Sequence, residues 1–246
     1  MAQGNTGLTD MPETDSSRIL ALIPAYNEAD RIGKVIEGAR SFLPVLVVDD
    51  GSTDETAAIA AGCGAVVLSQ VPNQGKGAAL KAGFRWAISK EYQAVLTLDA
   101  DGQHDPSEIP KFLEAFNSSW ADLIIGERDF NRIPPIRRLA NTLGRWSFSW
   151  AAGRRVPDNQ SGYRLVSQRL MEALLNSSES GFEFEVDMIV TSLQHGFRLD
   201  WVPIRTIYAG ETSHIHPLQH LIHFLRIVWQ TRKRMKQITP GQAGKT

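Results

Sequence analysis

Two aspartates one residue apart follow an apolar stretch in the segment AVLTLDADGQHDP, residues 94–106. If the apolar residues form a strand, Asp99 and Asp101 point to the same side, because side chains two positions apart on a strand share a face. Paired carboxylates suit hard divalent cations such as Mg²⁺ or Mn²⁺, which prefer oxygen ligands. The pattern favours a metal site with positions left for phosphate oxygens. Its plainer alternative is a turn in which the aspartates cap local amides.

A second acidic pair ends another apolar stretch, in VVDDGSTDET, residues 47–56. Turn formation and helix capping explain the residues that follow the pair, up to Asp54. They do not explain two adjacent carboxylates, Asp49 and Asp50, at the end of a strand. We expect one of the two to accept hydrogen bonds from a nucleobase N–H group or a ribose hydroxyl.

A glycine-rich segment with a lysine, PNQGKGAA, covers residues 72–79. It is not a Walker A loop, because that motif needs a glycine where this chain has Gln70. The segment reads either as a helix start with permissive glycines or as a loop whose Lys76 contacts a ligand. No G-x-G-x-x-G run favours a dinucleotide.

The scaffold that positions these motifs is an alternation of apolar strands and helices. It predicts a parallel sheet covered on both faces, with ligands bound beyond the carboxyl ends of the strands. The motifs PAYNE, DDGS and DADGQH all stand at such ends. The predicted strands are 18–24, 44–50, 65–70, 94–99 and 121–127, and the predicted helices are 28–42, 53–61, 75–89 and 107–117.

The second half of the chain is less regular. An extended piece is expected within 158–166 and an edge-like strand at 197–204. Helices are expected at 136–153, 181–196 and 216–236. The last of these carries an apolar stripe and a basic end, so it either lies on an anionic membrane surface or packs on the core.

The composition excludes several classes of protein. The chain has 246 residues and a formal net charge of -1, which argues against a nucleic-acid binder. A single cysteine, Cys63, allows no internal disulfide, and no apolar run is long enough to span a bilayer. Residues 1–17 lack the apolar core of a signal peptide and are expected to form a disordered tail. We therefore expect a cytoplasmic protein, with peripheral contact to the inner face of the membrane.

The order of these motifs resembles a known family. ALIPAYNE, VVDDGSTDET, NQGKGAALKAGF, LTLDADGQHDP and DNQSGYRL follow one another as in family 2 glycosyltransferases and are most similar to the dolichyl-phosphate mannosyltransferase branch. The resemblance covers 18–204. It implies the GT-A fold, a Rossmann-like α/β nucleotide-diphospho-sugar transferase fold whose mostly parallel central sheet is flanked by helices. It also implies a nucleotide-sugar donor, GDP-mannose or a UDP-hexose, with Mg²⁺ or Mn²⁺ as cofactor and inversion at the anomeric carbon.

The resemblance carries site residues over one by one. It assigns Asp99, Asp101 and Gln103 to the metal, and Asp101, Asp158 and Glu185 to catalysis. Two positions depart from the family pattern: Glu127 stands in a Gly-Ser-Arg-like segment, and His214 stands where lysine is usual. The implied substrate-binding residues are Pro24, Tyr26, Glu28, Asp50, Lys76, Gly77, Asp99, Arg128, Ser161, Arg164 and His214.

The acceptor is open at this stage. A hydroxyl acceptor, as in polysaccharide or glycolipid synthesis, needs a general base such as Asp158 or Glu185, whereas a polyprenyl phosphate is already ionised and needs none. The absence of a Q-x-x-R-W motif points to single transfer. Alternatives from other classes are a haloacid dehalogenase-like phosphatase, which also uses D-x-D-G, and a non-catalytic nucleotide-sugar binder. We expect one catalytic domain over 18–215, the helix 216–236 and a frayed end at 237–246.

Overall fold

The computed structural model describes residues 18–129, 135–181, 183–205, 207 and 217–236. Side chains of 135–141 and 217–224 lie outside this description. The predictions for the two tails and for His214 therefore concern residues outside the described part of the chain.

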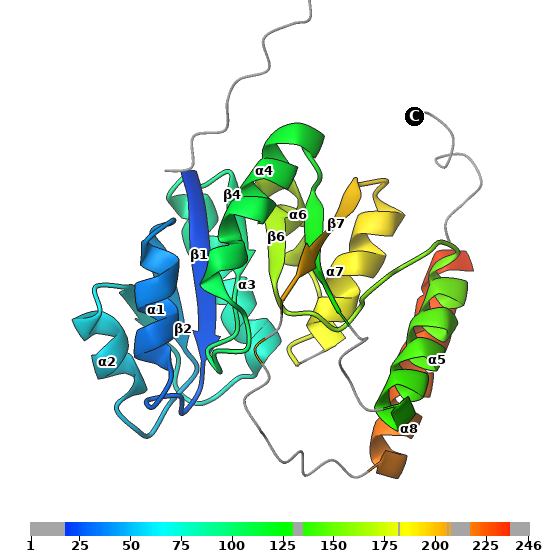
Figure 1. Cartoon of the computed structure of the whole chain (residues 1–246), viewed down its shortest axis with the longest axis horizontal. Coiled ribbons are helices and arrows are strands. Elements are labelled where there is room, and N and C mark those ends of the chain that lie inside the picture. The colour runs from blue at the N-terminus through cyan, green and yellow to red at the C-terminus, as the bar shows by residue number, and fades with distance from the viewer. Residues whose placement is uncertain (1–17, 130–134, 182, 206, 208–216, 237–246) are drawn as a thin grey trace, which may run out of the picture.

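A seven-stranded sheet forms the centre of the molecule, with strand order β3-β2-β1-β4-β6-β5-β7 (Figure 1). Every pair is parallel except those made by β6, which runs antiparallel between β4 and β5. The edge position of the last strand confirms the prediction for 197–204. The strands are β1 (Ile19–Ala25), β2 (Val45–Asp49), β3 (Val66–Ser69), β4 (Ala94–Thr97), β5 (Leu123–Arg128), β6 (Arg164–Ser167) and β7 (Leu199–Ile204).

Helices cover both faces of this sheet (Figure 1). Their buried residues divide into two clusters: α1, α2 and α4 pack on one face, and α3, α5, α6 and α7 on the other. The helices are α1 (Ile32–Arg40), α2 (Thr56–Gly62), α3 (Lys76–Ser89), α4 (Ile109–Ser119), α5 (Pro135–Ala152), α6 (Gln168–Leu174), α7 (Glu183–Gln194) and α8 (Pro217–Lys236), with a short 3₁₀ turn at Pro106–Glu108.

The central strands are apolar on both faces, as expected for a covered parallel sheet. In β1, Ile19 and Ala21 belong to the cluster under α1, whereas Leu20 and Leu22 belong to the cluster under α3. This division follows from the two-residue period of a strand, which sends neighbouring side chains to opposite faces. The sheet is thus a rigid platform whose carboxyl edge carries the polar motifs.

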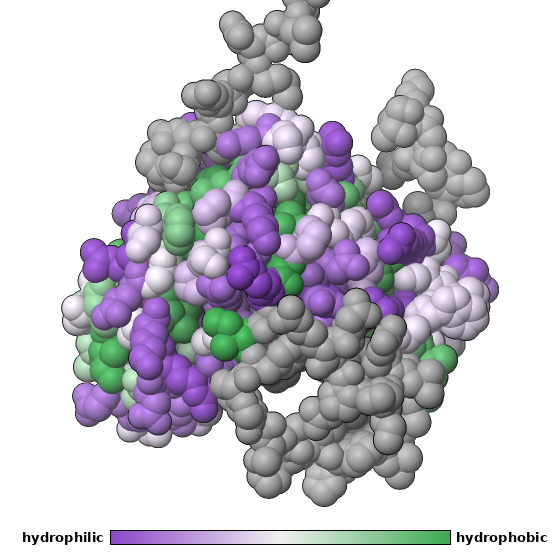
Figure 2. Space-filling view, viewed as in Figure 1, coloured by the Kyte–Doolittle hydropathy of each residue, from purple (hydrophilic) through white to green (hydrophobic). Residues whose placement is uncertain are grey.

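The last helix packs beside α5 at one end of the molecule (Figure 1). It also contacts α7, and Thr231 and Val228 on its inner face are almost fully buried. No helix in the described ranges is both long and apolar enough to cross a membrane. The face seen in Figure 2 is largely hydrophilic, with small separate apolar areas.

Candidate functional site

The carboxyl ends of β1, β2 and β4 surround a pocket of about 420 Å³. Tyr26 lies on its rim with 49% of its surface exposed. Most of the residues predicted from the first four motifs meet here, although they are spread over some eighty positions of the chain. The lining residues are Pro24, Ala25, Tyr26, Glu28, Asp50, Asn73, Gly75, Lys76, Ala79, Asp99, Ala100 and Asp101.

The loop after β1 is fixed by the polar residues that follow β2. The N–H group of Asn27 donates to Ser52 Oγ at 2.9 Å, and the N–H group of Glu28 donates to Thr56 Oγ1 at 2.8 Å. Asn27 Oδ1 in turn accepts a bond of 2.8 Å from the N–H group of Thr53. The turn residues of DDGSTDET therefore hold the PAYNE loop at the pocket rim, which goes beyond the capping role expected from the sequence.

Asp50 fastens the glycine-rich segment to the sheet. Its Oδ1 accepts from the N–H group of Gln74 at 2.9 Å, and its Oδ2 accepts from the N–H group of Gly75 at 2.7 Å. Gly75 has φ +90°, and a Cβ there would lie 2.8 Å from the carbonyl oxygen of Ser180. Because this backbone is fixed at both points, the first residue of α3, Lys76, starts at a defined place.

Lys76 bridges two carboxylates at the floor of the pocket. Its Nζ lies 2.5 Å from Asp99 Oδ1 and 2.7 Å from Glu185 Oε1. Burial lowers the pKa of Lys76, but the negative charges of Glu185 and Asp99 outweigh burial and leave the pKa above its ordinary value. Burial raises the pKa of Asp99, and the positive charge of Lys76 outweighs it, so the net pKa of this carboxyl is lowered. Both groups are therefore charged at neutral pH.

Glycine at position 162 brings the later motif against this ion pair. A Cβ at Gly162 would lie 2.7 Å from Asp99 Oδ2 and 3.0 Å from Glu185 Oε1. Gly77 is equally enclosed, since its Cβ would lie 2.8 Å from the Cβ of Phe184. These contacts give Gly77 a packing reason, separate from the substrate contact predicted for it.

Asp101 and Gln103 continue the loop beyond β4. The N–H group of Gln103 donates to Asp101 Oδ1 at 2.9 Å, and its carbonyl oxygen accepts from Ile207. Within the described ranges, no three histidine, cysteine, aspartate or glutamate side chains gather as a ready metal cage. Two carboxylates beside an open pocket still fit a metal whose other ligands come from a bound diphosphate.

His104 is a site neighbour to which sequence reasoning gave no role. Its Nδ1 accepts the N–H group of Asp99 at 3.0 Å, and its Nε2 lies 3.7 Å from Asp99 Oδ2. The ring stacks on Tyr163, with centroids 4.8 Å apart. Burial lowers the pKa of His104, so the ring is neutral at neutral pH. The D-x-D-G-x-H spacing could have indicated it, because a side chain five residues on can reach back to a strand end.

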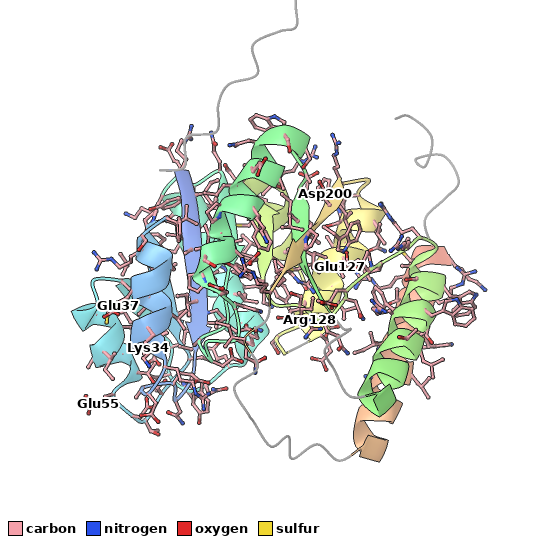
Figure 3. All side chains as sticks on the ribbon, viewed as in Figure 1. Lys34, Glu37, Glu55, Glu127, Arg128 and Asp200 are labelled. Atoms are coloured by element: carbon pink, nitrogen blue, oxygen red, sulfur yellow. The ribbon has the colours of Figure 1, made fainter. Side chains whose placement is uncertain are left out.

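Arg128 and Asp158, two further predicted site residues, form an ion pair and do not line the pocket. Arg128 ends β5, close to Glu127 (Figure 3). Its Nε and Nη2 atoms lie 2.7 Å and 3.0 Å from the two oxygens of Asp158. Asp158 Oδ1 also accepts from the N–H groups of Gln160 and Ser161. The carboxylate is 1% exposed, so this pair anchors the start of the SGYR segment.

Residues 21–172 match the model of the family described as Glycosyl transferase family 2. The chain belongs to this family. The glycosyltransferase is 35% identical over 205 residues to the undecaprenyl-phosphate mannosyltransferase of Micrococcus luteus, with 76% of this chain and 82% of the relative covered. It is 33% identical to the polyprenol monophosphomannose synthase of Mycolicibacterium smegmatis, with 77% of each chain covered. Family and branch agree with the sequence analysis, and they rule against the phosphatase alternative.

Solved structures confirm the GT-A fold. Glucosyl-3-phosphoglycerate synthase of Mycobacterium tuberculosis superposes with a TM-score of 0.68 at 22% identity, covering 93% of this glycosyltransferase and 84% of the synthase. Another structure of that synthase, in complex with Mn²⁺, UDP and phosphoglyceric acid, has the same TM-score of 0.68 at 20% identity. It covers 92% of this chain and 81% of the other.

Two residues predicted to bind substrate do not line the pocket of the glycosyltransferase. Arg164 is fully buried and donates to the carbonyl oxygens of Ser161 at 2.7 Å, of Asn159 at 3.1 Å and of Glu185. It ties the loop before β6 to the start of α7 instead of facing the pocket. Ser161 is also fully buried, and its Oγ has no hydrogen-bond partner within the described residues.

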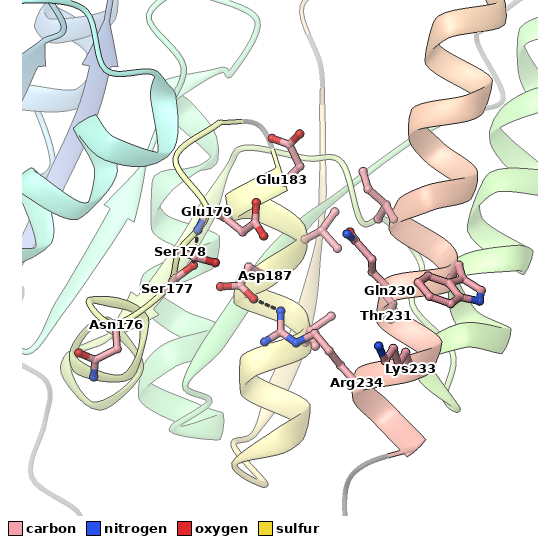
Figure 4. Close-up of a pocket in the computed structure, with 14 residues that line it drawn as sticks. Asn176, Ser177, Ser178, Glu179, Glu183, Asp187, Gln230, Thr231, Lys233 and Arg234 are labelled. Atoms are coloured by element: carbon pink, nitrogen blue, oxygen red, sulfur yellow. Dashed lines mark hydrogen bonds and ion pairs between the residues drawn. The ribbon is translucent and has the colours of Figure 1, made fainter.

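A second pocket of about 560 Å³ lies between α7, α8 and the loop after α6 (Figure 4). An ion pair between Asp187 and Arg234 crosses it, and Arg234 Nη2 donates to Gln194 Oε1 at 2.8 Å. Glu183 also lines this pocket, two residues before Glu185 of the first site. The helix that carries Glu185 is therefore attached to α8 on its other side.

Proposed function

We propose that this glycosyltransferase moves a single sugar from a nucleoside diphosphate donor to a polyprenyl phosphate. The observation that carries the proposal is the pocket that brings Tyr26, Asp50, Lys76, Asp99 and Asp101 together at one edge of the sheet. The relatives named for undecaprenyl-phosphate and polyprenol substrates support the acceptor class.

The donor half of the pocket suits a nucleotide. Tyr26 offers an exposed ring beside Pro24 for a base, and the Asp50 carboxylate has remaining acceptor capacity for a base N–H group or a ribose hydroxyl. Lys76 lines the same pocket, and its positive charge can attract the diphosphate. Asp99, Asp101 and Gln103 would hold a Mg²⁺ or Mn²⁺ ion, whose charge would offset the negative charge that develops on the leaving diphosphate.

The partners of the two candidate bases favour an acceptor that is already ionised. Asp158 is held by Arg128 and two backbone amides, and Glu185 Oε1 is held by Lys76. Carboxylate oxygens that already accept these hydrogen bonds are less available to take a proton from an acceptor hydroxyl. A phosphate oxygen needs no proton removed before it attacks the anomeric carbon. We therefore assign Asp158 and Glu185 to positioning when the acceptor is a phosphate.

Peripheral membrane contact is part of the proposal, because a polyprenyl phosphate lies in a bilayer. Trp146 and Trp150 on α5 and Trp229 on α8 are 72%, 58% and 65% exposed. The guanidinium of Arg232 lies 4.9 Å from the ring of Trp150. Exposed tryptophans next to basic side chains suit the interface of an anionic bilayer, and we place the enzyme at the cytoplasmic face.

A donor screen followed by a transfer assay tests this function. Thermal shifts of the whole protein with GDP-mannose, UDP-glucose and UDP-N-acetylglucosamine, each with Mn²⁺, identify the donor. Transfer from the labelled donor is then measured to undecaprenyl phosphate in detergent and, in parallel, to soluble hydroxyl acceptors including phosphoglyceric acid. Label in the lipid phosphate supports the proposal, label only in a hydroxyl acceptor replaces it, and no transfer from any bound donor rejects both.

A further inference from the structure

We propose that the ammonium group of Lys76 occupies the cation position beside Asp99 until a donor arrives, and that it competes with the metal ion for that carboxylate. The inference rests on the metal site of the proposed function. The inference adds one step to the proposed function: Lys76 must leave Asp99 before the metal can take its full set of ligands.

Both oxygens of Asp99 already have neighbours. Oδ1 lies 2.5 Å from Lys76 Nζ, and Oδ2 faces His104 Nε2 at 3.7 Å. Gly162 closes the same side, since a Cβ there would lie within 3 Å of either oxygen. A metal ion that approaches Oδ1 therefore meets a like charge at close range in a partly dry site, where repulsion is strong.

The attachment of Lys76 lets its side chain exchange partners. Its backbone is fixed, because Asp50 holds the N–H groups of Gln74 and Gly75 just before it. Its side chain has four methylene groups and lines the donor pocket together with Asp99 and Asp101. Glu185 provides the second carboxylate that keeps the ammonium group in place, with its Oε1 at 2.7 Å.

A diphosphate bound in this pocket offers the Lys76 ammonium group new anionic partners, because Lys76 lines the same pocket. When the ammonium group turns to the phosphates, Asp99 Oδ1 becomes available to the metal. Without nucleotide, the metal must compete with Lys76 and binds weakly. Without metal, the nucleotide still binds partly through Lys76. Because coupling between two binding sites is reciprocal, donor and metal each raise the affinity for the other.

The experiment measures the binding of each component separately on the full-length protein. Free Mn²⁺ is followed by electron paramagnetic resonance without nucleotide, and GDP and UDP are titrated calorimetrically in EDTA. Lys76→Met should bind Mn²⁺ at least 5-fold more tightly than the wild type and bind the preferred nucleotide at least 5-fold more weakly. Lys34→Met is the matched control: it removes the same charge from an exposed position of α1 that does not line the pocket and lies away from Arg128 (Figure 3), and it should change neither value.

Opposite changes in the two affinities distinguish competition from damage, because a distorted site would lose both ligands. The inference is overturned if Lys76→Met binds Mn²⁺ no more tightly than the wild type, or if its nucleotide affinity does not fall. Lys76→Gln serves in the same way should the methionine variant not fold. Neither binding measurement involves sugar transfer. A negative transfer assay therefore rejects the proposed acceptor but leaves the competition between Lys76 and the metal standing, and a negative binding result leaves the proposed acceptor standing.

Discussion

Arg128 and Asp158 form a two-point ion pair whose N–O distances are 2.7 Å and 3.0 Å, although β5 and the loop before β6 bring them from positions thirty residues apart. Parallel N–H groups of a guanidinium match the two oxygens of a carboxylate, and the match fixes orientation as well as distance. The pair joins the end of one strand to the approach of the next, so it sets where the SGYR segment begins.

Replacing Arg128 with alanine should destabilise the fold, because Asp158 is 1% exposed and would be left charged without its partner. Since Arg128 itself is 25% exposed, we expect a loss of roughly 2–3 kcal/mol, below the full cost of breaking a buried pair. Urea unfolding at neutral pH measures it. Arg128→Lys should recover only part of the loss because it keeps one contact, and equal stability of alanine variant and wild type would contradict the anchoring role.

A methyl group at position 162 should disturb the carboxylates of Asp99 and Glu185. Gly162→Ala places its Cβ 2.7 Å from Asp99 Oδ2, so the side chain or the loop must move. We expect about a 100-fold loss of transfer rate and a stability loss of about 1–3 kcal/mol from overpacking. The matched control is Gly62→Ala in α2, where no atom lies within 4 Å of the added Cβ. If both variants transfer sugar equally well, the close contact has no catalytic consequence.

Asp101→Ala should remove transfer activity, with a fall in kcat of at least about 1000-fold, because a metal ligand next to the leaving group is lost. Donor affinity measured in EDTA should change little, since the residues that we propose bind the nucleoside follow β1 and β2. Exposed Asp30 provides the charge control, Asp30→Ala, with activity close to that of the wild type. Near-normal transfer by Asp101→Ala would reject the metal assignment.

The Lys76–Asp99 pair predicts a pH dependence of stability with a defined sign. The pKa of Lys76 is raised in the folded state, so its contribution is complete below about pH 10.4 and is lost as pH rises through the folded pKa. The pKa of Asp99 is lowered, so its contribution is complete above about pH 3.9 and is lost as pH falls through the folded pKa. The stability difference between wild type and Lys76→Met, measured in EDTA, should be level between these limits and shrink beyond them. A difference that grows in acid would show that another group dominates.

Contact with anionic membranes should depend on the exposed tryptophans. Replacing Trp146, Trp150 and Trp229 together with alanine should weaken binding to phosphatidylglycerol vesicles by at least about tenfold. The reason is that the variant lacks the three rings that would be buried at the membrane interface. Co-sedimentation with vesicles measures it. Phe42→Ala, an exposed aromatic beyond α1, should have no effect. Should the triple variant sediment like the wild type, the α5–α8 surface is not the contact.

The motifs at the ends of β1, β2 and β4 could be placed from sequence because apolar runs reveal the strands, and the carboxyl ends of parallel strands meet at one edge. Two features could not be predicted from the sequence. The four residues of β6, Arg164–Ser167, do not reveal that they insert antiparallel between β4 and β5, since pairing is decided by tertiary packing. The burial of Arg164 was hidden for a related reason: its guanidinium donates to the carbonyl oxygens of the nearby Ser161 and Asn159 and of Glu185 at the start of α7, and the sequence does not reveal that α7 packs there.

Because β6 runs antiparallel beside β5, the segment between them begins and ends at neighbouring points of the sheet. It leaves the sheet at Arg128 and returns at Arg164, which pairs in register with Ile125 of the neighbouring strand. The Arg128–Asp158 ion pair also joins the end of β5 to the loop before β6. Because both ends of this segment are fixed to the sheet, its sequence can vary between them without moving the ends of β1, β2 and β4, except near Gly162, which packs against Asp99. Chimeric enzymes joined at Arg128 and Arg164 would show whether this segment affects the choice of acceptor.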